Sequence, residues 1–225
     1  MSFILNIETA TKNCSVSISK DGETILCKEI AEEGYSHAEK LHVFIEEVIA
    51  ESGVSVQDLV AVAVSQGPGS YTGLRIGVSA AKGLCFALNI PLIAIDTLQT
   101  LASQAKVTDG KIIPMLDARR MEVYSEVFTS NLEIERAIQA EVITEESFAA
   151  YTDKIYFVGD CAEKCKPVLT KENFVFLEEI KYPSANAMSK LSYAKYQKSD
   201  TVDVAYFEPY YLKDFMMTLP SKKQQ

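Results

Sequence analysis

The segment Gln-Gly-Pro-Gly-Ser-Tyr-Thr-Gly-Leu-Arg-Ile-Gly, residues 66–77, forces a tight turn between two regular elements. An apolar run at residues 59–64 precedes it, and a helical pattern rich in small residues follows it, over about residues 72–88. Pro68 lacks an N–H and fixes φ, and the flanking glycines tolerate positive φ, so neither helix nor strand continues through the turn. A strand, a glycine-rich turn and a helix N-terminus together can receive an anion on backbone N–H groups.

The loop matches neither of two familiar phosphate-binding signatures. A Walker loop ends in Gly-Lys-Ser/Thr, whereas Thr72-Gly73-Leu74 offers no lysine for a phosphate. A dinucleotide fingerprint would need its third glycine where Thr72 stands. We therefore favour a structural turn with close helix packing, and keep contact with a nucleotide or another anion as the alternative. The residues of that alternative site are Glu8, Thr9, Gly67, Gly69, Ser70 and Thr72.

The helix after the loop carries a stripe of small residues, Gly73, Gly77 and Ala81, at spacings of four. Each glycine costs a helix about 1 kcal/mol relative to alanine, so two on one face indicate a packing requirement. The stripe would be an unusual choice for a helix that faces only its own core. We therefore predict that this helix and the one at residues 37–52 form a protein-binding surface. Its predicted residues are His37, Leu41, Gly73, Leu74, Gly77, Val78, Ala81 and Cys85.

The order of elements in the first half of the chain indicates a ribonuclease-H-like lobe. Period-two patterns and an Asp21-Gly22 turn predict three antiparallel strands at the start. Apolar residues recurring at three and four predict an amphipathic helix after them. The predicted strands lie at residues 3–7, 14–19, 24–30, 59–64 and 91–95, and the predicted helices at 37–52, 72–88 and 97–106. An α/β fold follows from this alternation.

The second half of the chain reads as another α/β lobe. The loop at residues 107–111 is the predicted boundary, which divides the chain into lobes at 1–106 and 107–225. Strands are predicted at residues 112–116, 122–128 and 155–158, and helices at 145–151 and 184–196. The C-terminal segment could pack back on the first lobe.

Composition restricts the classes of function. The 225 residues are 48% hydrophobic, enough for a substantial core, and 22 basic against 31 acidic side chains give a net charge of −9. Such a field repels polyphosphate, which argues against unaided binding of DNA or RNA. No basic leader and no apolar run near the ~20 residues of a membrane span are found, so we expect a cytoplasmic protein without a membrane partner. The five cysteines are expected to be buried thiols.

Neither a metal site nor a catalytic residue is predicted. His37 and His42 are five residues apart, about 140° around a helix, and do not converge on one metal. Cys161 and Cys165 supply two thiols, too few for a closed zinc site. Glu8, after the first strand, could hold Mg²⁺ or could simply be hydrogen-bonded to nearby backbone.

A charged cluster lies between two predicted strands of the second lobe. It consists of Asp117, Arg119, Arg120 and Glu122. The cluster could recognise an anion or form a solvated turn, and the residue pattern leaves both readings open.

Four stretches resemble the TsaB (YeaZ) family over essentially the whole chain. They are ILNIETATKNCSVSIS at 4–19, SQGPGSYTGLRIGVSAAKGL at 65–84, LDARRMEVY at 116–124 and EPYYLKD at 208–214. The resemblance implies the actin-like ATPase (ASKHA) superfold, with two ribonuclease-H-like lobes and mixed sheets. It also implies a scaffold or activating subunit without catalysis of its own. Its partners would be a TsaD-type catalytic subunit and a TsaE-type ATPase, for threonylcarbamoyl transfer to the tRNA adenosine following the anticodon.

The expected partners and cofactors follow from this scaffold role. Without its partner, the same surface would pair with itself as a homodimer, and tRNA would be met only indirectly. The chain would have no cofactor of its own, with ATP or ADP and Mg²⁺ bound in the assembled complex. Glu8 stands where many relatives have aspartate, which weakens the case for independent ATP hydrolysis, and Cys161 after Gly159-Asp160 is a second departure. The competing hypothesis is a stand-alone nucleotide-binding ATPase or phosphotransferase of this superfold.

Overall fold

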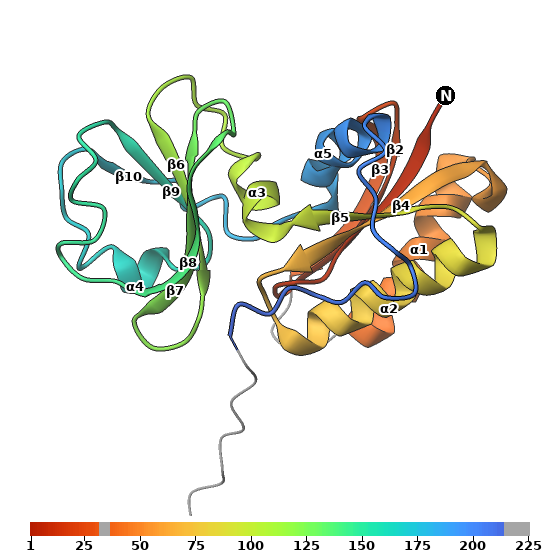
Figure 1. Cartoon of the computed structure of the whole chain (residues 1–225), viewed down its shortest axis with the longest axis horizontal. Helices are drawn as coiled ribbons and strands as arrows, with labels where there is room; N and C mark the ends of the chain where they lie inside the picture. The colour runs from red at the N-terminus through yellow and green to blue at the C-terminus, as the bar shows by residue number, and fades with distance from the viewer. Residues whose placement is uncertain (32–36, 214–225) are drawn as a thin grey trace, which may run out of the picture.

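Two lobes, each built on a five-stranded mixed sheet, lie side by side in the computed structural model (Figure 1). The structure describes residues 1–31 and 37–213. The first sheet contains β1 (Phe3–Glu8), β2 (Asn13–Lys20), β3 (Glu23–Ala31), β4 (Leu59–Gly67) and β5 (Leu92–Asp96). Its order is β3-β2-β1-β4-β5; the first three strands are antiparallel, and β4 and β5 run parallel to β1. This agrees with the predicted ribonuclease-H-like lobe.

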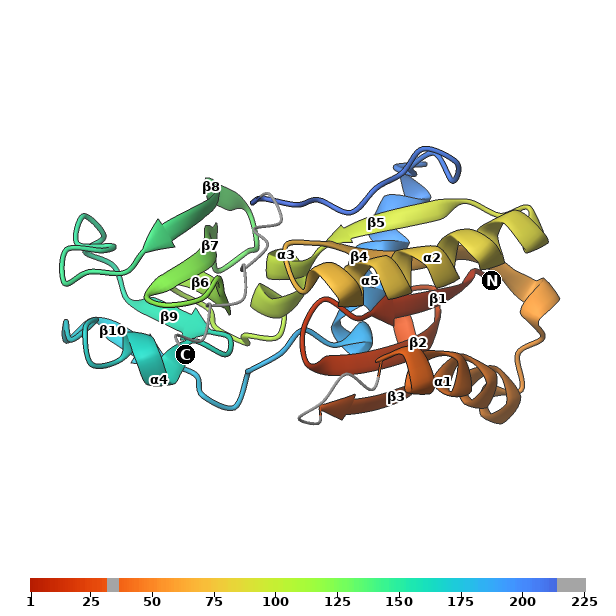
Figure 2. The same ribbon diagram turned by 90° about the horizontal axis from the view of Figure 1, so that it is seen from below.

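Helices cover both faces of the first sheet because successive strand residues point to opposite sides. In β1, Leu5 and Ile7 join the core under α1 (His37–Ser52) and α2 (Tyr71–Leu88), whereas Ile4 joins the core of the other face. Figure 2 shows α1 and α2 together on one face. A short helix, η1 (Val56–Asp58), leads from α1 into β4.

The opposite face of the first sheet is covered by α5 (Ala185–Gln197), which comes from the C-terminal part of the chain. Its Ala185 and Met188 pack against Ile4 and Ile93. Hydrogen bonds tie the start of α5 to β2, where Ser15 Oγ accepts from the Ala185 N–H at 2.7 Å. The first lobe is therefore completed by α5, which begins 78 positions after residue 107, where the second lobe was predicted to start.

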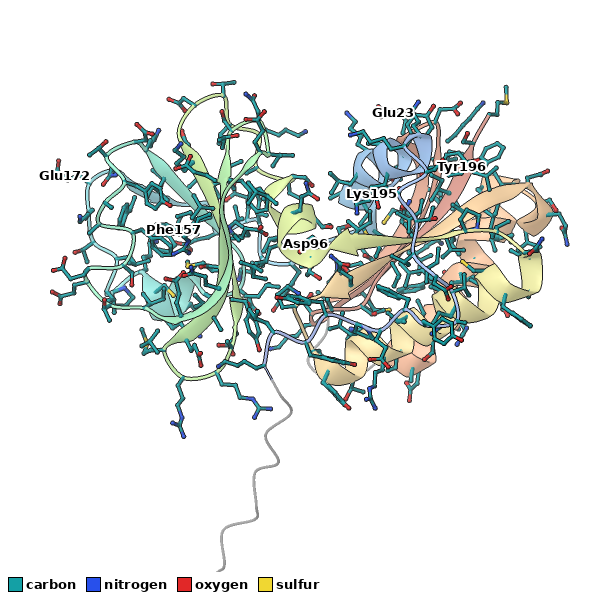
Figure 3. All side chains as sticks on the ribbon, in the orientation of Figure 1. Glu23, Asp96, Phe157, Glu172, Lys195 and Tyr196 are labelled. Carbon is teal, nitrogen blue, oxygen red and sulfur yellow. The ribbon has the colours of Figure 1, made fainter. Side chains whose placement is uncertain are left out.

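The second sheet repeats the strand order of the first. It contains β6 (Lys111–Asp117), β7 (Glu122–Thr129), β8 (Ile134–Val142), β9 (Ile155–Val158) and β10 (Phe174–Phe176). Strands β6, β7 and β8 are antiparallel neighbours, and β9 and β10 continue parallel to β6. Phe157 lies in the middle of the core of the second lobe, beside α4 (Ala162–Cys165) (Figure 3). Its ring centroid is 5.6 Å from that of Phe148 and 4.8 Å from that of Phe176.

The short helix α3 (Thr97–Ala102) joins the two lobes. Its Leu98 and Leu101 pack with Ile112, Leu116 and Phe128 of the second sheet. Because α3 follows β5 directly, this apolar cluster couples the edge of the first sheet to the face of the second. No helix among residues 1–31 and 37–213 is long and apolar enough to cross a membrane.

Two predicted helices need correction, and two strands lay outside the predictions. Residues 145–151 are not a helix but successive turns, because Phe148 has φ of 60° and interrupts any α-helical path. The helix predicted at 97–106 ends at Ala102. Strands β8 and β10 were not predicted, since β8 is an edge strand with largely exposed side chains and β10 has only three residues.

Truncating Met188 to alanine is expected to destabilise the first lobe by about 2–5 kcal/mol, because a fully buried side chain leaves a cavity. Urea unfolding of Met188→Ala measures the change. Lys190→Ala, at a solvent-exposed position of the same helix, is the matched control and should change the free energy of unfolding by less than about 0.5 kcal/mol. Equal effects of the two variants would contradict the packing of α5 on this sheet.

Candidate functional site

The glycine-rich loop uses its backbone donors within the chain. The Gly67–Pro68 peptide bond is cis. The Gly67 N–H donates to Thr97 Oγ1 at 3.2 Å, and the Ser70 N–H donates to the Ala10 carbonyl at 2.6 Å. Ser70 Oγ then caps α2 by accepting from the Gly73 N–H at 3.3 Å. The N–H groups of Gly67, Ser70 and Gly73 are thus already paired within the chain.

The small-residue stripe of α2 packs on the end of β1. Thr9 Oγ1 donates to the Gly73 carbonyl at 2.8 Å, and Thr9 is fully buried. A Cβ atom at Gly73 would overlap the Thr9 carbonyl oxygen, one at Gly77 would overlap Thr9 Oγ1, and one at Gly69 would overlap the Ala10 carbonyl. The packing requirement that the glycines indicate is therefore imposed by the chain's own first strand.

The residues proposed for the partner surface are all covered by this chain. Buried residues of α1 and α2 include His37, Leu41, Gly73, Leu74, Gly77, Val78, Ala81 and Cys85. His37 lies with Nε2 2.7 Å from the Thr11 carbonyl. The inference that the stripe faces outward is corrected, because it faces Thr9. Any partner that meets these two helices must touch their exposed neighbours.

Those neighbours form a groove between α1 and α2 with a volume of about 640 Å³. It is lined by Ala38, His42, Tyr71, Thr72, Arg75, Ile76, Ser79 and Ala80. At one end, the Arg75 guanidinium stacks 4.2 Å from the centre of the Tyr71 ring, and its Nε donates to Tyr211 Oη at 3.2 Å. The small side chains along the rest of the groove leave room for a helix of another chain to approach closely.

Glu8 ends β1 inside the protein and is fully buried. Its carboxylate accepts from Ser65 Oγ and, at 2.6 Å, from the Ala10 N–H. Burial raises the pKa of Glu8 to about 7, with a smaller contribution from Asp96, and the two hydrogen bonds act in the opposite direction. Of the two readings open at Glu8, this geometry matches a strand-end carboxylate satisfied by its own surroundings.

Two further acids with raised pKa values, the half-buried Asp96 and the buried Glu126, lie where the lobes meet. Asp96, at the end of β5, caps α3 by accepting from the Gln99 N–H at 2.9 Å and lies between the lobes in Figure 3. Glu126 on β7 is 4% exposed, and burial, then Asp96, raises its pKa to about 7. Burial likewise raises the pKa of Asp96. Sequence reasoning missed both residues; an acid within an apolar strand was the only signal.

The residues present do not fit a magnesium nucleotide held by this chain alone. Glu8 is enclosed, the Gly67 and Ser70 donors are paired, and a Cβ at Gly67 would contact the Tyr210 carbonyl of the C-terminal segment. Thr72 is the exposed member of the predicted anion site. Within the described parts of the chain, no three His, Cys, Asp or Glu side chains are arranged to hold a metal ion. Cys161 and Cys165 are buried free thiols.

The C-terminal segment covers this region and links the lobes. Val202 pairs with Leu92 of β5, and the Tyr210 N–H donates to the Gln66 carbonyl at 2.7 Å. Lys213 then forms an ion pair with Glu122 of β7. In Figure 1 this segment runs along α2 toward the second lobe.

Comparisons with known proteins agree along the chain. The family model described as "TsaD: tRNA N6-adenosine threonylcarbamoyltransferase" matches residues 29–216. The tRNA threonylcarbamoyladenosine biosynthesis protein TsaB of Escherichia coli is 30% identical over 94% of each chain, and that of Haemophilus influenzae is 29% identical over 94% of this chain and 93% of its own. The structure of YeaZ from Pseudomonas aeruginosa superposes with a TM-score of 0.83 at 23% identity, covering 94% of this chain and 100% of that one.

The fold is that of the actin-like ATPase superfold. Beyond YeaZ, the ethanolamine utilization protein EutJ from Carboxydothermus hydrogenoformans superposes with a TM-score of 0.52 at 12% identity, over 84% of this chain and 89% of that one. At this identity the likeness concerns the fold alone. Together with the two mixed sheets, it agrees with the fold class predicted from the sequence.

Adding one methyl group at Gly77 is expected to destabilise the protein by roughly 1–3 kcal/mol, because the new Cβ overlaps Thr9 Oγ1. Gly83→Ala is the matched control: Gly83 lies in the same helix with nothing within 4 Å of an added Cβ. It should stabilise the protein by about 0.5–1 kcal/mol. Chemical denaturation of both variants measures the difference, and equal signs would contradict the packing of α2 on Thr9.

Replacing Glu8 by glutamine is expected to flatten the pH dependence of stability. The pKa of Glu8 is raised from 4.5 to about 7, so between these pH values the folded state binds more protons than the unfolded state. The free energy of unfolding therefore falls as pH rises through that window. Relative to wild type, Glu8→Gln should gain roughly 3 kcal/mol between pH 4.5 and pH 8.

Urea unfolding at a series of pH values from 4.5 to 8 measures this gain. Glu39→Gln, at an exposed position of α1, is the control and should follow the wild-type profile. Parallel profiles for Glu8→Gln and wild type would contradict the buried, protonatable state of Glu8.

Proposed function

Because this chain belongs to the TsaB (YeaZ) family of tRNA threonylcarbamoyladenosine biosynthesis proteins, we propose that it is a non-catalytic subunit of a tRNA-modifying complex. In this proposal it binds a TsaD-type catalytic subunit, which transfers a threonylcarbamoyl group to the tRNA adenosine following the anticodon. A TsaE-type ATPase binds the same assembly. ATP or ADP and Mg²⁺ belong to the assembled complex rather than to this chain.

The observation that carries the proposal is the groove between α1 and α2. Its lining residues are half-buried to exposed and half of them are small, namely Ala38, Thr72, Ser79 and Ala80, while Tyr71 and Arg75 lie at one end. A helix pair from another chain fits such a surface, because small residues allow close approach of helix axes.

The sequence relation between this chain and the catalytic subunit also supports the groove between α1 and α2 as the docking site. The family model of the catalytic protein matches residues 29–216 of this chain, so the two subunits are related in sequence. Related chains can pair through equivalent surfaces, as the two copies of an isologous dimer do. The groove therefore also serves for a homodimer when the catalytic partner is absent.

Absence of independent catalysis is supported by the chemistry at the end of β1. A stand-alone ATPase or phosphotransferase would need Glu8 and the loop N–H groups to hold metal and phosphate. Glu8 is bonded to Ser65 and to the Ala10 N–H, and the Gly67 and Ser70 donors are paired within the chain. These groups support the glycine-rich loop instead.

Introducing an arginine in the groove is expected to weaken binding of the TsaD-type subunit. Ser79 is exposed on α2 and lines the groove, so Ser79→Arg places an unpaired charge in the proposed interface. An affinity loss of at least about tenfold is expected, since burying such a charge costs more than 1.4 kcal/mol. Titration calorimetry with the purified catalytic subunit measures it.

The control is Ala194→Arg, at an exposed position of α5 on the opposite face of the first sheet. It should bind the catalytic subunit as the wild type does. Unchanged affinity for Ser79→Arg, with the protein folded, would refute the groove as the docking site.

A further inference from the structure

The hairpin between β6 and β7 presents two adjacent arginines in an uncommon backbone conformation. Arg119 and Arg120 have φ of 76° and 53°, and both side chains are exposed. This left-handed region favours glycine and asparagine, because a Cβ atom crowds the backbone there. Residues kept in a strained conformation point to a use for their side chains.

The acids beside the arginines are paired with other cations. Lys164 of α4 forms an ion pair with Asp117, and Lys213 forms one with Glu122. Within residues 1–31 and 37–213, neither arginine guanidinium has a hydrogen-bond or ion-pair partner. The tip of the hairpin therefore carries two uncompensated positive charges on a chain whose net charge is −9.

The backbone of the tip is held in place. Lys164 Nζ donates to the Arg120 carbonyl at 2.9 Å and to the Glu122 carbonyl at 2.7 Å. The Arg119 N–H donates to Asp117 Oδ1 at 3.1 Å, and the Glu122 N–H donates to the Arg119 carbonyl at 3.1 Å. The backbone from which the two side chains project is thus fixed before any ligand binds, so binding does not have to order the hairpin itself.

The hairpin lies near the groove between α1 and α2. Tyr211 contacts Tyr71 and Arg75 at one end of that groove, with ring centroids of the tyrosines 4.9 Å apart. Lys213, two residues further on, is paired with Glu122 in the hairpin. The Cα atoms of residues 211 and 213 are at most about 7 Å apart, so the C-terminal segment connects this end of the groove to the hairpin through the side chains of Tyr211 and Lys213.

We propose that Arg119 and Arg120 bind backbone phosphates of the tRNA that the assembled complex modifies. This contact rests on the proposed function, and it revises the expectation that tRNA is met only indirectly. Guanidinium groups match phosphate oxygens in geometry as well as charge. The rest of the acidic chain repels a polyanion, so the contact positions RNA already held by the partner.

An RNA backbone fits the tip better than an acidic protein segment does. A specific protein interface is centred on buried apolar side chains with charges at its rim. Here the neighbouring Met121 packs against the core of the second lobe, which leaves the tip to the two arginines. Charged groups without an apolar centre are typical of phosphate contacts.

The test uses the complex of this chain with its TsaD-type subunit and an unmodified tRNA transcript with adenosine after the anticodon. Fluorescence anisotropy is recorded over a series of salt concentrations. The double variant Arg119→Gln with Arg120→Gln should bind tRNA roughly tenfold more weakly, and the slope of log affinity against log salt should fall by about one to two. Lys106→Gln with Lys198→Gln removes the same charge at exposed positions elsewhere and should change the affinity less than about twofold.

A second variant distinguishes a role of the arginines in tRNA binding from a role in protein stability. Arg119→Gly with Arg120→Gly relieves the left-handed strain, so its Tm should equal or exceed that of the wild type while its affinity for tRNA falls. A lowered Tm with unchanged tRNA affinity would assign the arginines a structural role and overturn the proposal.

Partner binding and ATP binding by the same complexes are measured in parallel. Formation of the wild-type complex tests the proposed function by itself, and its failure would refute both proposals. If the complex forms, unchanged tRNA affinity in the double variant overturns the arginine contact. A loss of partner affinity instead would assign the tip to a protein, and a loss confined to ATP would assign it to a nucleotide.

Discussion

The close approach of α2 to the end of β1 is the contact on which the rest of the first lobe depends. Thr9 and Ala10 occupy the space that side chains at Gly69, Gly73 and Gly77 would fill. This approach lets the Ser70 N–H reach the Ala10 carbonyl and Thr9 Oγ1 reach the Gly73 carbonyl. The adjacent Glu8 carboxyl group is fully buried, and its pKa rises because its charged form is removed from water.

The same contact determines which parts of the glycine-rich loop and of α2 remain accessible. The Gly67 and Ser70 N–H groups are paired within the chain, and the inner face of α2 is buried against the sheet. The outer face of α2 is left exposed beside α1, where the groove runs. In the proposed function, Thr9 and the glycine-rich loop therefore hold α2 in place, and the exposed opposite side of α2 faces the partner.

The C-terminal segment contacts both lobes. It follows α5, which completes the first lobe, and then passes from Gln66 to Glu122 by way of Tyr210 and Lys213. Lys213 pairs with Glu122 and Lys164 pairs with Asp117, so that within residues 1–31 and 37–213 the Arg119 and Arg120 side chains have no ion-pair partner. Acidic and basic residues of the hairpin are neighbours in the sequence, but in the structure its acids pair with lysines from other segments and not with its two arginines.

Local patterns in the sequence predicted the succession of strands and helices in the first lobe, including the helices at residues 37–52 and 72–88 and the turn at 66–77, because periodicity and turn chemistry act over a few residues. They identified a small-residue face on α2 but not its neighbour, since spacing defines a face and only packing decides what covers it. The burial of Glu126 and the left-handed Phe148 likewise depend on residues distant in the chain. Those properties arise from tertiary structure, which sets solvent exposure and pairs charges across long sequence separations.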